Sequence, residues 1–167
     1  MKKVVQHTFA MAEADFFSKV FFEEDYARRM HMEALGNASF EIISQSGDLK
    51  TGIHRHVVTA PNMNAPKVVQ KILGDSIQYS EKGTYLPAEN RFEFSLTPSR
   101  LADKIQIQGA IWTKEDGPTS MIRFSEVTAQ VKIFGAGKVI EQFIADSSVE
   151  NFNKTARFTE RWITDHL

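Results

Sequence analysis

The sequence contains no cysteine and has no excess of charge of either sign. The absence of cysteine from its 167 residues excludes disulfides, thiolate metal ligands and a cysteine nucleophile. Twenty basic residues against 21 acidic residues leave a net charge of -1. This balance argues against an overall electrostatic attraction to nucleic acid or to an anionic membrane. We therefore expect no nucleic-acid partner.

Long apolar runs are missing as well. The N-terminal Met1-Lys2-Lys3-Val4-Val5 resembles the start of a signal peptide, but Gln6 and His7 interrupt the apolar stretch that would have to follow. No stretch has the length of a membrane span. We expect a cytoplasmic protein without stable membrane insertion. No linker, repeat or low-complexity tract divides the chain, so residues 1–167 are predicted to form one domain.

Phenylalanine is abundant, whereas the polar aromatic residues are scarce. Thirteen Phe accompany three Tyr and two Trp, in a chain that is 42% hydrophobic and 25% charged. These proportions are typical of a folded globular protein. The aromatic side chains are almost purely apolar, which indicates an apolar core or an apolar pocket.

Helical spacing appears early in the chain and again at its end. Residues 14–22 carry Phe16, Phe17, Val20 and Phe21 on one face, which we expect to be buried. A second short helix is predicted to end near residue 35, before a capping Gly36. After Gly135-Ala136-Gly137, residues 138–166 form one long predicted helix.

The pattern between the helices has a period of two and predicts strands. A first strand precedes the early helices, and six more follow them, with a short helix at residues 67–73. Short turn-rich segments separate these strands, which favours an antiparallel meander. The predicted strands are 4–9, the stretch from 37 to a turn at 46–48, 50–59, 76–86, 91–96, 104–113 and 119–133. The fold class is therefore α+β, with a curved antiparallel sheet of about seven strands wrapped around the C-terminal helix.

This order of elements resembles the START-like, helix-grip superfamily (SRPBCC), which includes Bet v 1 and polyketide-cyclase relatives. The residues that carry the resemblance are Arg55–Val58 with Pro66–Gly74, Thr119–Ile133, and the stretch from Phe134 to Trp162. It is closest to an uncharacterised bacterial family within the superfamily. The resemblance implies a cavity for a hydrophobic molecule such as a lipid, sterol or polyketide-like compound. No motif here matches a catalytic signature, and no cofactor is implied.

Strand alternation singles out residues 53–57. Ile53 and Val57 are predicted to face the cavity, and Arg55 with them. A buried guanidinium requires a partner, and Glu81 is the candidate because it shares a face with Tyr79. Such a pair would orient the polar head of a ligand; the alternative is an ordinary surface pair produced by a shift of register. His54 and His56 point the other way, and we interpret them as solvent-facing rather than metal-binding, since no third ligand is evident.

Other residues are predicted to line the same cavity. Ser148, Asn151 and Thr155 form a polar stripe in the middle of the long helix beside Phe152, with a solvent-facing stripe as the alternative. Phe92 and Phe94 share one strand face. The predicted ligand-binding residues are Arg55, Tyr79, Glu81, Phe92, Phe94, Ser148, Asn151, Phe152 and Thr155.

Two further features remain open. Ile122 and Phe124 are out of phase with Val127 and later apolar residues, which predicts a β-bulge near Ser125-Glu126 that curves the strand or turns Glu126 toward a site. The loop at residues 61–66 exposes Met63 and precedes Lys67 and Lys71. It is interpreted either as a lid in transient contact with a membrane or as a rigid turn.

The leading hypothesis is a non-enzymatic carrier or sensor of a hydrophobic small molecule. The first alternative is a cyclase- or hydrolase-type enzyme that uses Arg55, Glu81 or Glu126 on an apolar substrate. The second is a protein-interaction module with a filled core. No phosphate-binding loop, nucleophile elbow or dinucleotide fingerprint is present.

Overall fold

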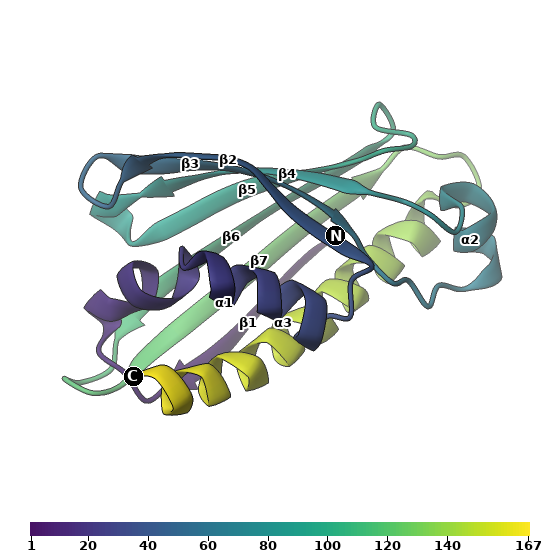
Figure 1. Ribbon diagram of the computed structural model, residues 1–167. Coiled ribbons are helices and arrows are strands. Elements are labelled where there is room, and N and C mark those ends of the chain that lie inside the picture. Colours follow the sequence, from purple (N-terminus) through teal and green to yellow (C-terminus); the bar gives the residue numbers. More distant parts are fainter.

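Seven antiparallel strands form one open sheet in the computed structural model, which describes residues 1–167 (Figure 1). The strand order is β1-β7-β6-β5-β4-β3-β2, so six strands form a meander and the first strand pairs with the last. The bounds are β1 Lys2–Phe9, β2 Ser39–Asp48, β3 Gly52–Ala60, β4 Tyr79–Leu86, β5 Arg91–Pro98, β6 Ile105–Glu115 and β7 Met121–Val131. The predicted α+β helix-grip architecture is confirmed.

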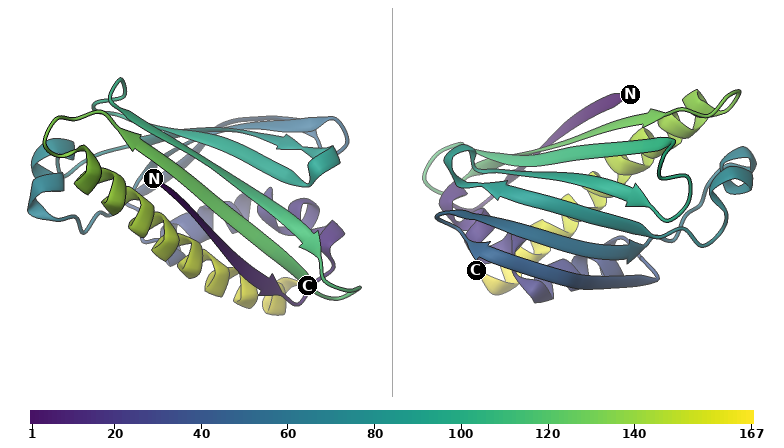
Figure 2. Two further views of the ribbon diagram at one scale, coloured as in Figure 1. Left: turned by 180° about the vertical axis from the view of Figure 1, so that it is seen from behind. Right: turned by 90° about the horizontal axis from the view of Figure 1, so that it is seen from above.

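The long helix α3, Gly137–His166, packs against β1 and β7 on one face of the sheet. Shorter helices lie on the same side, α1 (Glu24–Arg29) near one end of the sheet and α2 (Lys67–Leu73) at the other (Figures 1 and 2). We call the covered face the inner face. No helix combines the length and apolarity needed to cross a membrane.

The region predicted as two short α-helices is more irregular than its apolar spacing indicates. It consists of the 3-10 helix η1 (Glu13–Asp15), the π-helix η2 (Phe17–Phe21), α1 and a second π-helix η3 (Met30–Ala34). Gly36 follows with a φ of 64°, as expected of a capping residue. The wider turn of a π-helix brings consecutive aromatic side chains onto the sheet. A further 3-10 turn, η4 (Pro87–Glu89), joins β4 to β5.

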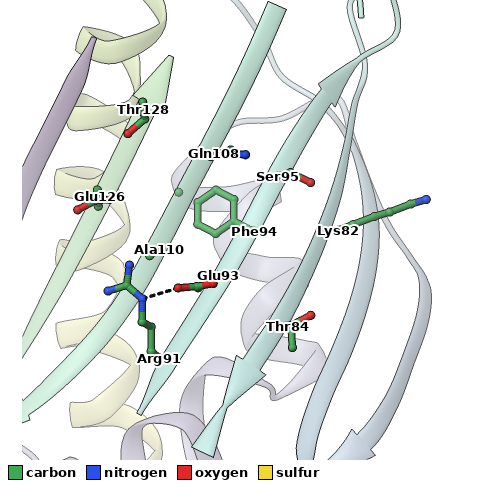
Figure 3. Close-up of a pocket in the computed structure, with 11 residues that line it drawn as sticks. Lys82, Thr84, Arg91, Glu93, Phe94, Ser95, Gln108, Ala110, Glu126 and Thr128 are labelled. Atoms are coloured by element: carbon green, nitrogen blue, oxygen red, sulfur yellow. Dashed lines mark hydrogen bonds and ion pairs between the residues drawn. The ribbon is translucent and has the colours of Figure 1, made fainter. Parts of the chain in front are cut away.

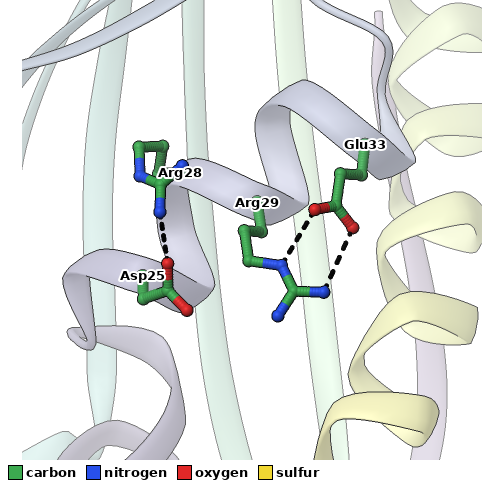
Figure 4. A network of polar contacts seen from close by, with 4 residues as sticks. All are labelled: Asp25, Arg28, Arg29 and Glu33. Carbon is green, nitrogen blue, oxygen red and sulfur yellow. Dashed lines mark hydrogen bonds and ion pairs between the residues drawn. The ribbon is translucent and has the colours of Figure 1, made fainter.

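Ion pairs on α1 and η3 face outward. Arg28 pairs with Asp25, and Arg29 forms two hydrogen bonds to Glu33, at 2.9 Å from Nε and 3.4 Å from Nη2 (Figure 4). Exposed pairs of this kind contribute little to stability. Arg29 has a second role, because its guanidinium lies 5.5 Å from the centre of the Trp162 ring on α3.

The predicted bulge in β7 is wrong. β7 pairs with β6 and β1 in continuous register, and the irregularity lies instead in β2, between Ile42 and Ser44. Ile122 and Phe124 face outward, where Phe124 stacks on Trp112 with ring centroids 5.2 Å apart. Glu126 also lies on the outer face and pairs with Lys2 at 2.9 Å. It therefore does not reach the interior.

Two separate hydrophobic clusters make up the interior. The aromatic cluster lies beneath η1, η2 and α1, and the aliphatic cluster lies beneath α2 and the start of α3. The aromatic cluster comprises Phe9, Met11, Phe16, Phe17, Val20, Phe21, Tyr26, Ile53, Tyr85, Phe92, Met121, Ala156, Phe158, Trp162 and Ile163. The aliphatic cluster comprises Ala65, Val69, Leu73, Ile77, Ile105, Ile107, Val127, Ala129, Val131, Ala136, Ile140 and Ile144.

Candidate functional site

Polar side chains occupy the inner face between the two clusters. In β7, Met121 belongs to the aromatic cluster and Val127 to the aliphatic one, and the inward-facing residues between them are Arg123 and Ser125. We call this region the central band. It consists of Arg55, Tyr79, Glu81, Phe94, Arg123 and Ser125 from the sheet and Ser148, Phe152 and Thr155 from α3. Most of these residues were predicted to bind a ligand.

Arg55 and Glu81 meet in the central band, as strand alternation predicted. β3 and β4 are neighbours, and Val57 pairs with Glu81, which brings the carboxylate within 3.7 Å of the Arg55 guanidinium. Only 8% of Arg55 is exposed. Its guanidinium carbon lies 4.8, 5.4 and 5.1 Å from the ring centres of Phe21, Phe22 and Phe92. Arg55 is therefore held by an acid on one side and three aromatic faces on the other.

The ionisation of this pair is governed by burial. Burial lowers the pKa of Arg55, and the charge of Glu81 partly offsets that shift. Burial also raises the pKa of Glu81, against the effect of Arg55. Tyr79 is a neutral phenol at ordinary pH, since burial raises its pKa to about 12. The Nε of Arg55 has no hydrogen-bond acceptor, so the guanidinium keeps an unused donor.

Glycines in β4 and β6 allow aromatic rings to lie flat on the inner face. Arg55 pairs with Gly83, Gly83 with Phe94, and Phe94 with Gly109, so these residues form one row across the sheet. A Cβ at Gly109 would overlap the Phe94 ring, and one at Gly83 would overlap the ring of Phe92. The floor of the central band is therefore aromatic.

A second buried arginine was missed by sequence reasoning. Arg123 is 3% exposed, and its Nη2 lies 3.1 Å from the carbonyl oxygen of Phe152, 3.4 Å from Oγ1 of Thr155 and 3.3 Å from Nδ1 of His7. The Nε2 of His7 lies 2.8 Å from Oδ1 of Asn153 and must donate to it, which leaves Nδ1 as a neutral acceptor. Burial lowers the pKa of His7; the hydrogen bond to Asn153 opposes this shift, and the charge of Arg123 adds to it.

The acceptors around Arg123 are all neutral, and the ring of Phe9 lies 5.1 Å from its guanidinium carbon. Its Nε and the hydroxyl of neighbouring Ser125 are buried without hydrogen-bond partners. Sequence reasoning placed the inward phase of this strand on Ile122 and Phe124. Arg123 and Ser125 are in phase with the apolar Val127 two residues later, and this spacing could have shown that they face inward.

Tyr26 connects α1 to α3 beside these groups. Its hydroxyl lies 2.7 Å from Oγ1 of Thr159, which in turn donates to the carbonyl of Thr155 at 2.7 Å. Because a threonine hydroxyl has one proton, Tyr26 is the donor to Thr159. Burial raises the pKa of Tyr26, although the charges of Arg123 and Arg55 oppose the shift.

The helix residues of the predicted stripe divide into two groups. Ser148 and Phe152 are half-buried and Thr155 is buried, so all three face the sheet. The hydroxyl of Ser148 bonds only to the carbonyl of Ile144 in its own helix, at 2.7 Å. Asn151 is exposed, which corrects its assignment to the cavity lining. The step from Ser148 to Asn151 is three residues, which is less than one helical turn, so the Asn151 side chain is rotated away from that of Ser148.

His54 and His56 lie on the outer face, as predicted. His54 is exposed, with its Nδ1 3.1 Å from Oγ1 of Thr84, and Nε2 of His56 lies 2.7 Å from the hydroxyl of Ser80. The loop at residues 61–66 differs from expectation, because Met63 is half-buried against the aliphatic cluster rather than exposed.

Two hollows lie outside the central band. One of about 390 Å³ lies on the outer face of β4–β7, where the Arg91–Glu93 pair and Glu126 border a small Ala110 (Figure 3). Another of about 600 Å³ lies between the end of β1, the β6–β7 turn and the last turns of α3. Its lining is mixed, with hydroxyls such as Thr8 and Ser120 beside Ile163. Neither coincides with the space expected between the sheet and the middle of α3.

Solved structures of the START superfamily and of cyclases have the same fold. A START superfamily protein from Mycobacterium smegmatis is 14% identical, with a TM-score of 0.64 over 97% of this chain and 98% of that one. The Zhui aromatase/cyclase from Streptomyces sp. R1128 is 12% identical, with a TM-score of 0.60 over 98% and 96%. Norcoclaurine synthase from Thalictrum flavum is 14% identical, with a TM-score of 0.65 over 100% and 89%. The chain therefore has the START-like, helix-grip fold.

The family can be stated more narrowly. The model of the family described as "Protein of unknown function (DUF2505)" matches residues 5–163, and the chain belongs to that family. No curated protein matches the chain in sequence. The expected position near an uncharacterised family of the superfamily is thus confirmed.

Proposed function

We propose that the protein binds a hydrophobic small molecule in the central band and acts as its carrier or sensor. One observation carries this proposal. Tyr79, Glu81 and Phe94 face inward by strand register, yet they remain half-buried, as do Ser148 and Phe152 on α3. Because these side chains point toward the helices rather than toward bulk solvent, their exposure indicates space between the sheet and α3.

The chemistry of the band suits an amphipathic ligand. Phe94 and Phe152 offer apolar surface, while Arg55 and Glu81 offer a charged donor and an acceptor. The 3.7 Å separation of that pair is longer than an optimal charge-assisted hydrogen bond, and Nε of Arg55 is unused. A polar ligand group bound there would satisfy Arg55 while the rest of the molecule contacts the rings.

The solved structures support this class of function through the fold alone. The norcoclaurine synthase structure contains dopamine and hydroxybenzaldehyde, which are small aromatic molecules. A fold that accommodates such compounds in one protein offers a comparable place for an apolar ligand here.

Native mass spectrometry of freshly purified protein, followed by solvent extraction, tests the proposal directly. Titration with dansyl-labelled undecanoic acid measures binding when the natural ligand has been lost. Ser148→Trp fills the band from the helix side without removing a tertiary hydrogen bond, and Asn151→Trp is the matched control on the exposed side of the same helix. We expect Ser148→Trp to reduce probe binding at least tenfold and Asn151→Trp to leave it unchanged.

Two results would overturn the proposal. One is a wild-type protein that neither carries an apolar compound nor binds the probe, which would favour an interaction module with a filled core. The other is equal binding by both tryptophan variants, which would move the ligand to one of the two other hollows.

An enzymatic role is the second candidate, and the raised pKa of Glu81 favours it. Burial raises the pKa of this half-buried carboxyl against the effect of Arg55, and a carboxyl with a raised pKa is suited to act as a general acid on a bound substrate. The test is to incubate the extracted ligand with protein and follow its mass. A change that Glu81→Gln abolishes, with ligand binding retained, would support an enzyme over a carrier.

A further inference from the structure

One end of the molecule combines exposed apolar side chains with an excess of positive charge. The β7–α3 turn, α2 and the β5–β6 turn lie together at this end in each of the views (Figures 1 and 2). We call it the basic end and define it as residues 67–75, 100–104 and 132–141. It lies over the aliphatic cluster, at the opposite end of the sheet from α1.

Contacts between the three segments hold the basic end together. The backbone N–H of Lys132 donates to the carbonyl of Lys104 at 2.8 Å, which joins the end of β7 to the β5–β6 turn. The side chain of Arg100 lies against Gly74, where α2 ends with a φ of 78°. The aliphatic cluster includes residues of α2, β6, β7 and α3 beneath them. The charged and apolar side chains are thus presented on a packed support.

Phe134 is the most exposed large apolar side chain of the protein. Its relative exposure is 105%, so its ring contacts no other part of the chain. Val139 on the first turn of α3 is 47% exposed, and Val68 on α2 is 42% exposed. Together they present apolar tips from two different segments.

The charges around these tips are unbalanced. The basic end contains six basic residues and three acidic ones, whereas the whole chain has a net charge of -1. One of the acids is engaged from outside these segments, since Glu141 lies 3.7 Å from the N-terminal amino group, whereas Asp103 lies 3.9 Å from Lys104 of the basic end itself. The basic residues, all exposed, are Lys67, Lys71, Arg100, Lys104, Lys132 and Lys138. The chain is therefore nearly neutral overall but carries a net positive charge at this end.

We propose that the basic end docks on the surface of a membrane that contains anionic lipids, with Phe134 inserted at the interface. Charge complementarity selects an anionic partner. The apolar side chains project from separate segments rather than lining a groove, so a protein partner would need a matching pit for each tip. A fluid lipid interface accommodates separate projections without such a match. The contact is peripheral, and it does not depend on the proposed function of the central band.

Sedimentation with lipid vesicles tests this inference on the full chain. We expect binding to vesicles of one part phosphatidylglycerol and two parts phosphatidylcholine, weaker binding to pure phosphatidylcholine, and weakening by salt. Phe134→Ser should reduce the partition coefficient about tenfold. Lys132→Ala combined with Lys138→Ala should reduce it about thirty-fold on anionic vesicles and far less on neutral ones.

Matched controls separate docking from folding and from ligand binding. Val4→Ser alters another exposed apolar side chain, 48% exposed on β1, and Lys19→Ala removes a cation outside the basic end; neither should change vesicle binding. Phe134 makes no packing contact, so Phe134→Ser should keep the circular dichroism spectrum and melting temperature of the wild type. Ser148→Trp should reduce probe binding in the central band at least tenfold and leave vesicle binding intact.

The outcomes are distinct. Failure of the wild-type protein to bind anionic vesicles overturns the inference, whatever the central band binds. Salt-sensitive binding that is unaffected by Phe134→Ser also overturns it, because a purely electrostatic contact indicates an acidic macromolecule rather than an inserted side chain. A Phe134→Trp variant whose fluorescence shifts to the blue on anionic vesicles, and is quenched by brominated lipid, would support insertion directly.

Discussion

The aromatic and aliphatic clusters both pack on the inner face of the same sheet, but different elements cover them. The aromatic cluster is covered by irregular 3-10 and π-helical turns in addition to α1 and the end of α3, and the charged guanidinium of Arg55 lies against its rings. The aliphatic cluster is covered by the regular helices α2 and α3, and its buried members are all aliphatic. Aromatic rings have faces that accept cations, so the first cluster can border a polar band, whereas branched aliphatic side chains offer no such interaction.

Truncation of a central side chain in each cluster should give the largest effects. Phe16 is fully buried, with its ring centroid 5.1 Å from that of Phe17 and 6.0 Å from that of Phe21. We expect Phe16→Ala to lower the free energy of unfolding by about 4 kcal/mol, through lost burial, a cavity and lost ring contacts. Leu73→Ala, equally buried in the aliphatic cluster, should cost about 3 kcal/mol. Urea denaturation measures both values, and a larger loss for Leu73→Ala would contradict the special contribution of ring packing.

Removal of Arg55 should give the next largest effect, because it tests the border between the aromatic cluster and the central band. Arg55→Leu leaves the carboxylate of Glu81 without its partner, and we expect a loss of about 3 kcal/mol near neutral pH. The double variant Arg55→Leu with Glu81→Leu should recover much of that loss, since no unpaired charge stays buried. Denaturation of both variants gives the comparison. If the double variant is less stable than Arg55→Leu, the packing of the Phe21 and Phe92 rings requires the cation itself.

Acidification should lower the free energy of unfolding through His31, which lies on η3 at the end of the molecule that holds the aromatic cluster. Burial, followed by the charge of Arg55, lowers the pKa of His31 from 6.5 to about 3, and its ring stacks on Phe40 with centroids 4.3 Å apart. The unfolded chain therefore binds a proton at pH values where the folded protein does not. This proton uptake does not reduce the free energy of unfolding above pH 6.5. Between pH 6.5 and about 3 it lowers that free energy by about 1.4 kcal/mol for each pH unit.

The matched variant His31→Phe keeps the stacking and removes the titration. Its stability, measured by denaturation from pH 7.5 to 4, should fall less steeply than that of the wild type. Parallel curves for the two proteins would contradict the assignment of this loss to His31.

Much of this architecture followed from alternation and spacing. Ile53 and Val57 flank Arg55 with apolar residues in phase, so its inward direction and its meeting with Glu81 could be predicted from neighbouring antiparallel strands. Arg123 could not be placed in the same way. Phe124 and Ile122 are apolar but face outward, and hydropathy does not distinguish a ring stacked on an outer Trp112 from a core residue.

The helices show a similar division. The length of α3 was predictable, but the exposure of Asn151 depends on a rotation of a few tens of degrees that spacing does not determine. The π-helical turns of η2 and η3 were missed because their hydrogen bonds form in response to packing on the sheet. The exposure of Phe134 was also unpredictable, since apolar character alone predicts burial.

The smallest expected effect on stability comes from removing the hydroxyl of Tyr26 in the aromatic cluster or of Tyr79 beside the aliphatic cluster. Tyr26 donates a buried hydrogen bond to Thr159, and Tyr26→Phe should cost about 1 kcal/mol because it removes that bond and leaves the Thr159 oxygen without a donor. Tyr79 packs against the aliphatic cluster, and only burial shifts the pKa of its hydroxyl. Tyr79→Phe should therefore change stability by less than about 0.5 kcal/mol. Thermal and urea denaturation of the pair measure the difference. Equal losses would mean that Tyr79 uses its hydroxyl structurally, whereas a neutral Tyr79→Phe variant with weaker probe binding would assign that hydroxyl to the ligand.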